Sequence, residues 1–220
     1  MISLTEENYL KAIFHLSEAG DGAVLTNDLA SRMNTRAATV TDMLRKLAAK
    51  NLIEYQKYHG VEITANGRAE ALKIIRKHRL WETFLVQKLN FAWDEVHEVA
   101  EQLEHIQSPL LIEKLDEFLA FPKADPHGEP IPDKNGKMAE VKQIPLSESQ
   151  SKKGSTLSSV KNDSPSFLQY LTKIGMKLGS KIFIINKTDF DGSHEVLIDG
   201  KKKAFISRDA AENIMVREMS

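Results

Sequence analysis

A change of pattern near the N-terminus constrains the fold of this chain more than any other feature. Thr26 precedes a short helical segment, NDLASRM, and Asn34-Thr35 then separates it from a longer helical segment at about 36–50. The longer segment repeats aliphatic residues at the spacing of one helix face: Val40, Leu44 and Leu47. A short helix, a tight turn and a longer helix predict a helix-turn-helix.

The residues that follow extend this prediction. Residues 52–64 read LIEYQKYHGVEIT, two alternating runs on either side of His59-Gly60, which predicts a β-hairpin. A hairpin placed directly after the second helix of a helix-turn-helix forms the wing of a winged helix. We therefore expect a winged helix-turn-helix domain over residues 1–64, with one more helix at about 5–19.

The longer helix and the hairpin carry basic and hydroxyl side chains of the kind that contact phosphates and base edges. We expect these residues to bind DNA: Thr35, Arg36, Thr39, Thr41, Arg45, Lys46 and Lys57. Two other interpretations stay open, a basic helix face that is only solvated and a winged helix that binds protein. The formal net charge of the chain is −1, so a DNA footprint has to be a local basic surface.

A stripe of histidine and acidic residues lies in the middle of the chain. His78 and Glu82 are four residues apart on a helix expected at about 65–89, so they share one face. The next expected helix carries four more such residues within about a 100° arc: His97, Glu101, Glu104 and His105. Imidazole and carboxylate groups without thiolate predict a site for Mn(II), Fe(II), Co(II) or Zn(II). The alternative is that these side chains are merely solvated on exposed helix faces.

The same region does not favour DNA, because acidic residues outnumber Lys and Arg by nine to five between residues 76 and 121. An enzyme, such as a helical metallohydrolase, is the alternative from a different functional class. The chain has no H-E-x-x-H, no G-x-S-x-G and no P-loop, and it has no cysteine that could act as a nucleophile. We expect no enzymatic activity.

The absence of cysteine from all 220 residues excludes disulfides and thiolate metal ligands, and it fits a cytoplasmic protein. No apolar run reaches the length of about 18 residues that spans a membrane. The N-terminus, MISLTEENYL, lacks the basic and apolar parts of a signal peptide. We expect a cytoplasmic protein that does not bind a membrane.

The second half of the chain changes character twice. Residues 122–136 are rich in Pro and Gly without a period, and residues 138–154 are polar and predict a linker. Short alternating runs with Asp-Gly turns follow, and they predict a small β-barrel at 155–220. The expected fold is mainly α with a small β part, and residues 65–137 form its helical, metal-binding region.

Four motifs carry a resemblance to a known family: NYLKAI, RKHRLWE, VHEVAEQLEH and DPHGEPIP. With this order of elements, the chain resembles the metal-dependent repressors of the diphtheria-toxin-repressor and manganese-transport-regulator family over nearly its whole length. The resemblance implies a helical dimerisation domain at 65–137 and, as in the longer members, an SH3-like (FeoA-type) domain at 155–220. It also implies a repressor of metal-ion homeostasis that binds double-stranded operator DNA as a metal-loaded homodimer.

The resemblance also assigns metal ligands. The primary site would use four residues: Asn8, Glu101, Glu104 and His105. The ancillary site would use His78, Glu82 and His97. In longer members the terminal domain adds an acidic ligand, and Asp163 best matches that place.

Departures from the family pattern bear on the metal. Glu101 stands where iron-responsive members have cysteine and manganese-responsive members have glutamate, and hard carboxylate oxygen suits Mn(II). Asn8 stands where iron members have methionine and manganese members aspartate, which weakens the argument for manganese. Lys11 stands where some manganese members place a ligand glutamate, which disfavours their binuclear site. We expect Mn(II) in preference to Fe(II).

Overall fold

The computed structural model describes residues 2–20, 23–56, 59–150 and 154–219. The contacts within the chain divide it into two compact units. Unit 1 holds the residues up to 78 together with 101–112 and 132–137, and unit 2 holds 79–100, 113–131 and the residues from 138 onward. Lys57, which we expect to contact DNA, lies outside the described residues.

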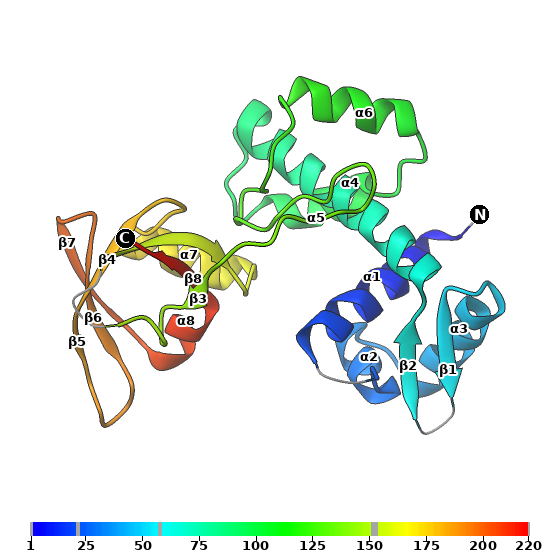
Figure 1. Cartoon of the computed structure of the whole chain (residues 1–220), viewed down its shortest axis with the longest axis horizontal. Helices are drawn as coiled ribbons and strands as arrows, with labels where there is room; N and C mark the ends of the chain where they lie inside the picture. Colours follow the sequence, from blue (N-terminus) through cyan, green and yellow to red (C-terminus); the bar gives the residue numbers. More distant parts are fainter. Residues whose placement is uncertain (1, 21–22, 57–58, 151–153, 220) are drawn as a thin grey trace. The chain divides into compact units, whose positions relative to one another are not determined.

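The N-terminal part of unit 1 is a winged helix-turn-helix, drawn in blue to cyan in Figure 1. Its elements are α1 (Leu4–Ala19), α2 (Thr26–Arg32), α3 (Ala37–Ala49), β1 (Ile53–Gln56) and β2 (Gly60–Ile63). The two strands are antiparallel, with Ile53 opposite Ile63. The aliphatic repeat of α3 points into the core, because its three members are 0% exposed: Val40, Leu44 and Leu47. The expected winged helix is thereby confirmed.

The helix α4 (Ala65–Leu89) continues directly from the wing. The Thr64 hydroxyl accepts a hydrogen bond from the Gly67 N–H at 3.0 Å, which satisfies a donor in the first turn of the helix. A Cβ at Gly67 would overlap the backbone carbonyl of Leu52, so glycine is required by this close approach. The first turn of α4 is therefore packed tightly against the base of the wing.

Two shorter helices follow, α5 (Val96–Leu103) and α6 (Pro109–Phe118). Because α5 ends at Leu103, Glu104 and His105 lie in the turn that follows it. The four His and Glu residues that we expected on one helix are therefore divided between the helix and this turn. The Ser108 hydroxyl caps the start of α6, since it accepts a hydrogen bond from the Leu111 N–H at 3.3 Å. No helix among the described residues is both long and apolar enough to cross a membrane.

The C-terminal part of unit 2 is a six-stranded antiparallel sheet with the order β3-β8-β4-β5-β6-β7 (Figure 1). Its strands are β3 (Ile144–Pro145), β4 (Gly154–Val160), β5 (Lys181–Lys187), β6 (His194–Ile198), β7 (Lys202–Ile206) and β8 (Ile214–Glu218). Two helices, α7 (Pro165–Ile174) and α8 (Arg208–Asn213), share its core through Leu168, Leu171 and Ala211. The expected small SH3-like β domain is confirmed.

Three elements of this domain were not expected from the sequence: β3, β4 and α8. The strand β3 lies within the range 138–154 that we had assigned to a linker, and it pairs with β8. The next residue, Leu146, is 0% exposed and belongs to the core of the C-terminal domain. The ordered β domain therefore uses residues on the N-terminal side of 155.

Candidate functional site

A first cluster of polar side chains in unit 1 joins α1 to the end of α5. The Lys11 ammonium donates to both carboxylate oxygens of Glu104, at 2.7 and 2.8 Å, and it also contacts Glu101. The exposed fractions of the side chains are 13% for Lys11, 33% for Glu101 and 0% for Glu104. Two of the expected metal ligands are thus brought together around an ammonium group.

His78 belongs to the same cluster. Its Nδ1 lies 2.6 Å from Oε2 of Glu104, although the resemblance had placed His78 with the ancillary ligands. Burial acts to raise the pKa of Glu104, but the hydrogen bond from His78 and the charges of Lys11 and His78 outweigh it. The pKa of Glu104 therefore lies below its usual value, and the carboxylate is ionised at neutral pH.

A buried carboxylate that the sequence did not single out orients His105. Oε2 of Glu7 lies 2.6 Å from Nδ1 of His105, and Gln107 donates to the other oxygen at 2.8 Å. Glu7 is 3% exposed. When Nδ1–H donates to Glu7, Nε2 is the ring nitrogen left to bind a cation, as in the carboxylate–histidine–metal arrangement of many metal sites.

Asn8 lies on α1 between two members of this cluster in the sequence, Glu7 and Lys11. Its Oδ1 is buried and has no hydrogen-bond partner among the residues that the structure describes. An unsatisfied buried carbonyl oxygen is costly, and a bound cation would satisfy it. Amide oxygen, carboxylate and imidazole together are a donor set that fits Mn(II) or Fe(II), so the residues expected for the primary site suit such an ion.

A second cluster lies in unit 2. Glu82, Asp125 and His127 are all buried, and one ligating atom of each lies within 4.8 Å of the others. Nε2 of His127 donates to the backbone carbonyl of Trp93 at 2.7 Å, which turns Nδ1 toward Glu82 at 3.6 Å. Three buried side chains of metal-ligating types, with Nδ1 of the histidine directed at Glu82, form a candidate metal centre.

Two expected ligands lie at the edge of this second cluster. Nδ1 of His97 is 3.5 Å from Oε1 of Glu82 and 3.7 Å from Oδ2 of Asp163, the acid just before α7. The structure thus brings Glu82, His97 and Asp163 together. It adds Asp125 and His127, which we had read only as part of the DPHGEPIP motif.

Burial and neighbouring charges shift the pKa values of two groups in the second cluster. Burial and then the charge of Glu82 raise the pKa of Asp125, against the opposing charge of Arg79. Burial acts to lower the pKa of His127, but Glu82 and Asp125 outweigh it and raise this pKa to about 9. Both groups therefore hold protons more tightly than usual.

The expected DNA-contacting residues lie along α3 and the turn before it. Arg36, Thr39 and Lys46 are exposed, and Arg45 forms an exposed ion pair with Asp42 at 3.2 Å. The Thr41 hydroxyl donates to the Ala37 carbonyl at 2.9 Å, so it is satisfied within its own helix. Thr35 is half-buried.

Two shallow hollows flank this helix. One is lined by Thr41 and Arg45 of α3 together with Tyr55 and Gly60 of the hairpin. The other is lined by residues of α2 and by Thr35 and Arg36. The first hollow therefore lies between α3 and the hairpin, and the second lies beside the turn before α3.

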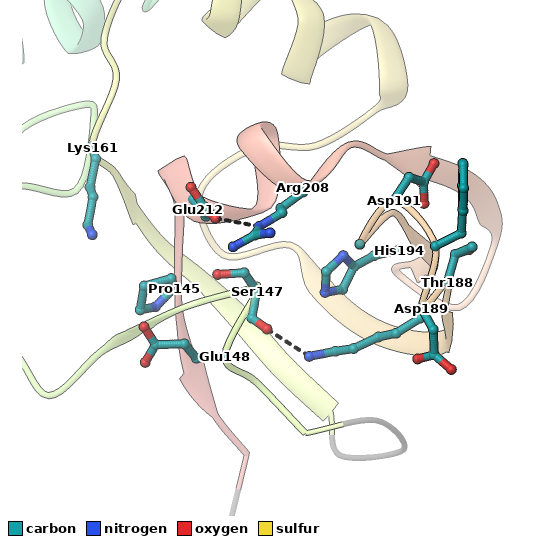
Figure 2. Close-up of a pocket in the computed structure, with 13 residues that line it drawn as sticks. Pro145, Ser147, Glu148, Lys161, Thr188, Asp189, Asp191, His194, Arg208 and Glu212 are labelled. Atoms are coloured by element: carbon teal, nitrogen blue, oxygen red, sulfur yellow. Dashed lines mark hydrogen bonds and ion pairs between the residues drawn. The ribbon is translucent and has the colours of Figure 1, made fainter.

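A polar cavity of about 730 Å³ in the C-terminal domain is a different kind of candidate (Figure 2). Its three cations (Lys161, Lys187 and Arg208) are matched by four carboxylates: Glu148, Asp189, Asp191 and Glu212. Burial, and then the charge of Lys187, lower the pKa of His194 on its wall. Within the described ranges, no group of three metal-ligating side chains within 4.8 Å lies here. The cavity is therefore not a candidate metal centre.

Models of known protein families match three successive parts of the chain. The N-terminal DNA binding domain of iron dependent repressors matches residues 1–61, and the metal binding and dimerisation domain of the same repressors matches residues 64–133. The FeoA domain matches residues 144–218. The third match begins at β3, which agrees with the structure in extending the C-terminal domain into the expected linker.

Individual relatives agree with these matches. The iron-dependent repressor IdeR of Mycobacterium leprae (strain TN) is 34% identical over 128 residues, 58% of this chain and 55% of that protein, so the match spans about half of the relative. The diphtheria toxin repressor of Corynebacterium glutamicum is 28% identical over 89% of this chain and 92% of its own length. A solved manganese-dependent transcriptional repressor in complex with manganese is 35% identical, with a TM-score of 0.89, over 97% of this chain and 100% of that one.

The order of the three domains and the near-complete coverage at 35% identity point to one family. The chain belongs to the iron-dependent repressor family of metal-dependent repressors, whose members are transcriptional regulators and not enzymes.

Proposed function

We propose that this chain is a cytoplasmic, metal-dependent transcriptional repressor that binds double-stranded operator DNA as a homodimer. One observation carries the proposal. The helix α1 packs inside the winged helix, and its Lys11 contacts the buried carboxylate of Glu104. Asn8, whose buried amide oxygen has no hydrogen-bond partner among the described residues, lies three residues before Lys11 on the same helix. A ligand set shared between the DNA-binding domain and the end of α5 can couple metal binding to the placement of α3.

The primary metal site is proposed to use the side chains of Asn8, Glu101, Glu104 and His105. A divalent cation bound there would supply positive charge and directed coordination bonds. The chain would supply the rest: Glu7 would keep Nε2 of His105 available, and the amide of Asn8 would bring α1 into the site. Loading would then favour one arrangement of the two recognition helices in the dimer.

A second metal site is proposed at Glu82, Asp125 and His127, with His97 and Asp163 at its edge. The burial of the three inner residues and the raised pKa of Asp125 support it, because a bound cation would relieve the repulsion between the carboxylates. His78 contacts Glu104 in the first cluster, so we assign it to the support of the primary site.

Mn(II) is proposed as the preferred metal, with Fe(II) as the alternative. Every candidate ligand is a nitrogen or a hard oxygen, and the chain contains no cysteine. The names of the relatives include both metals, since one is an iron-dependent repressor and another is a manganese-dependent repressor in complex with manganese.

The proposed DNA-binding residues are Thr35, Arg36, Thr39, Thr41, Arg45, Lys46 and Lys57. Homodimer formation is supported by large apolar side chains that α6 leaves exposed within the region matched to a dimerisation domain, Leu110 at 65% and Phe118 at 61%. Two recognition helices related by twofold symmetry would read half-sites about one helical turn, or a multiple, apart.

Selection from a pool of random duplexes tests the proposal without knowledge of the operator. The full chain should enrich one palindromic site when Mn(II) is present and no sequence when EDTA replaces it. The same selection with Fe(II) kept under anaerobic conditions, and with Zn(II), would rank the metals. Enrichment of the same site in EDTA would contradict metal dependence.

A further inference from the structure

The ammonium of Lys11 is hydrogen-bonded to the two carboxylates that we assign to the primary metal ion, those of Glu101 and Glu104. It donates to both oxygens of Glu104, at 2.7 and 2.8 Å, and it contacts Glu101 as well. The Lys11 side chain is 13% exposed and that of Glu104 is 0% exposed, so solvent screens the contact little. A positive charge is thus held at this place by the chain itself.

A metal ion and this ammonium need the same atoms. A carboxylate oxygen that accepts a hydrogen bond from an ammonium uses lone pairs that a metal ion also requires. Both oxygens of Glu104 are engaged by Lys11, and Oε2 also lies 2.6 Å from Nδ1 of His78. A divalent cation would in addition be repelled by the ammonium. The three contacts use most of the roughly four lone-pair sites of this carboxylate, so a metal ion and Lys11 compete for Glu104.

The arrangement of the other expected ligands is consistent with the Lys11 ammonium lying at the metal position. Among the described residues, Glu101, Glu104 and His105 do not form a group whose ligating atoms all lie within 4.8 Å. The amide oxygen of Asn8, three residues before Lys11 on α1, remains buried without a partner in the described part of the chain. Lys11 thus engages the two carboxylates, while the amide and imidazole ligands take no part in the contact.

We propose that Lys11 is a built-in competitor of the metal ion, which sets the free metal concentration at which the repressor becomes loaded. The proposal rests on the proposed function of the first cluster as the primary metal site. In the metal-free chain, the ammonium of Lys11 compensates the buried negative charge of Glu104. The incoming ion displaces Lys11, so one cation replaces another.

The alternative is that Lys11 only holds the ligands in a geometry that favours the metal. The two roles predict opposite results when the ammonium is removed. A competitor, once removed, leaves the carboxylates free and raises metal affinity. A supporting group, once removed, leaves the carboxylates disordered and lowers it. The sign of the change in Mn(II) affinity therefore separates the two roles.

The test is calorimetric titration of Mn(II) into the full chain carrying Lys11→Met, which keeps much of the side-chain volume and removes the charge. The Mn(II) affinity of the primary site should rise about tenfold or more. The repulsion between the ammonium and a metal ion a few ångströms away exceeds the roughly 1.4 kcal/mol that corresponds to a tenfold change in affinity. The midpoint of thermal unfolding of the metal-free protein should fall. Unchanged or weaker Mn(II) binding would overturn the proposal.

Two further variants complete the design. Lys11→Gln keeps an N–H donor to the carboxylates, so it should fold even if Lys11→Met does not, and it should also bind Mn(II) more tightly. Lys50→Met is the matched control, since Lys50 pairs with another buried carboxylate, Glu6, at 2.7 Å; it should leave Mn(II) affinity unchanged.

Glu104→Gln separates this proposal from the proposed function on which it rests. If Glu104→Gln leaves every Mn(II) binding event intact, the first cluster is not the primary site and both proposals fail. If Glu104→Gln removes one event but Lys11→Met does not strengthen that event, only the competitor role fails.

Discussion

Oε2 of Glu7 on α1 lies 2.6 Å from Nδ1 of His105 in the turn after α5. Both side chains are largely buried, and the second oxygen of Glu7 is held by Gln107 at 2.8 Å. The contact fixes which nitrogen of His105 carries the proton and which one can bind a metal ion. It also joins α1 of the winged-helix domain to the segment that holds Glu104, and this link between that domain and the proposed metal ligands is the basis of the proposed regulation.

Glu7→Gln should weaken Mn(II) binding at the primary site by about 10- to 100-fold, the usual cost of losing a group that orients a histidine ligand. The amide can rotate and offer His105 either a donor or an acceptor, so the tautomer is no longer fixed. Calorimetric titration of Mn(II) measures the loss. Glu6→Gln, at the adjacent buried carboxylate that pairs with Lys50, is the control and should bind Mn(II) as the parent does.

Glu104→Gln should remove the dependence of DNA binding on metal while leaving the fold intact. The substitution keeps the volume of a side chain that is 0% exposed but removes the charge that a metal ion needs. Fluorescence anisotropy on a selected duplex, with and without Mn(II), measures the effect. The control is Glu117→Gln, at a carboxylate 60% exposed on α6. Full Mn(II) dependence in Glu104→Gln would rule out this carboxylate as a ligand.

Arg36→Ala should weaken DNA binding about tenfold without changing Mn(II) affinity. Arg36 is the exposed residue immediately before α3, where a guanidinium can reach phosphates or base edges. If Arg36 contacts a phosphate, the salt dependence of binding should lose about one unit of its slope. Lys201→Ala, at an exposed lysine in the C-terminal domain, is the control. Equal DNA affinity in Arg36→Ala and the parent would show that this residue lies outside the interface.

The buried His194 should make the metal-free protein less stable in mild acid. Burial and the charge of Lys187 lower its folded pKa below the usual 6.5, so the folded state binds fewer protons than the unfolded state. Its contribution is therefore fully present above pH 6.5 and is lost as the pH falls through the lowered folded pKa. The thermal midpoint measured in EDTA should fall less steeply between pH 7 and 5 in His194→Leu than in the parent. Parallel curves would exclude His194 as a cause.

The sequence predicted the winged helix well because its signals are local. The repeat of Val40, Leu44 and Leu47 and the alternation around His59-Gly60 each report burial on one face of one element. The strand β4 gave no such signal, because two of its buried positions are serines. Ser155 and Ser159 are buried through hydrogen bonds, to Ser149 at 3.0 Å and to Gln143 at 3.0 Å. Buried polar residues that are satisfied by tertiary contacts give no hydrophobic alternation, so the sequence alone does not predict such a strand.

The candidate metal ligands also differ in how far the sequence alone could identify them. His78, Glu82 and His97 follow from helical spacing, whereas Asn8, Asp163 and the division into two sites came from the family resemblance. Asp125 and His127 lie in a stretch without a period, and only tertiary packing brings them to Glu82. The D-x-H spacing was visible within the DPHG motif, but no local pattern gave it a partner.

The affinity of the full chain for a selected duplex, measured by fluorescence anisotropy first in EDTA and then in excess Mn(II), tests the central claim most directly. The account predicts that Mn(II) strengthens binding by at least tenfold and that EDTA reverses the effect. By thermodynamic linkage, the same duplex should strengthen Mn(II) binding by the same factor. Equal DNA affinity in Mn(II) and in EDTA would contradict the account, because the metal would then have no influence on the placement of α3.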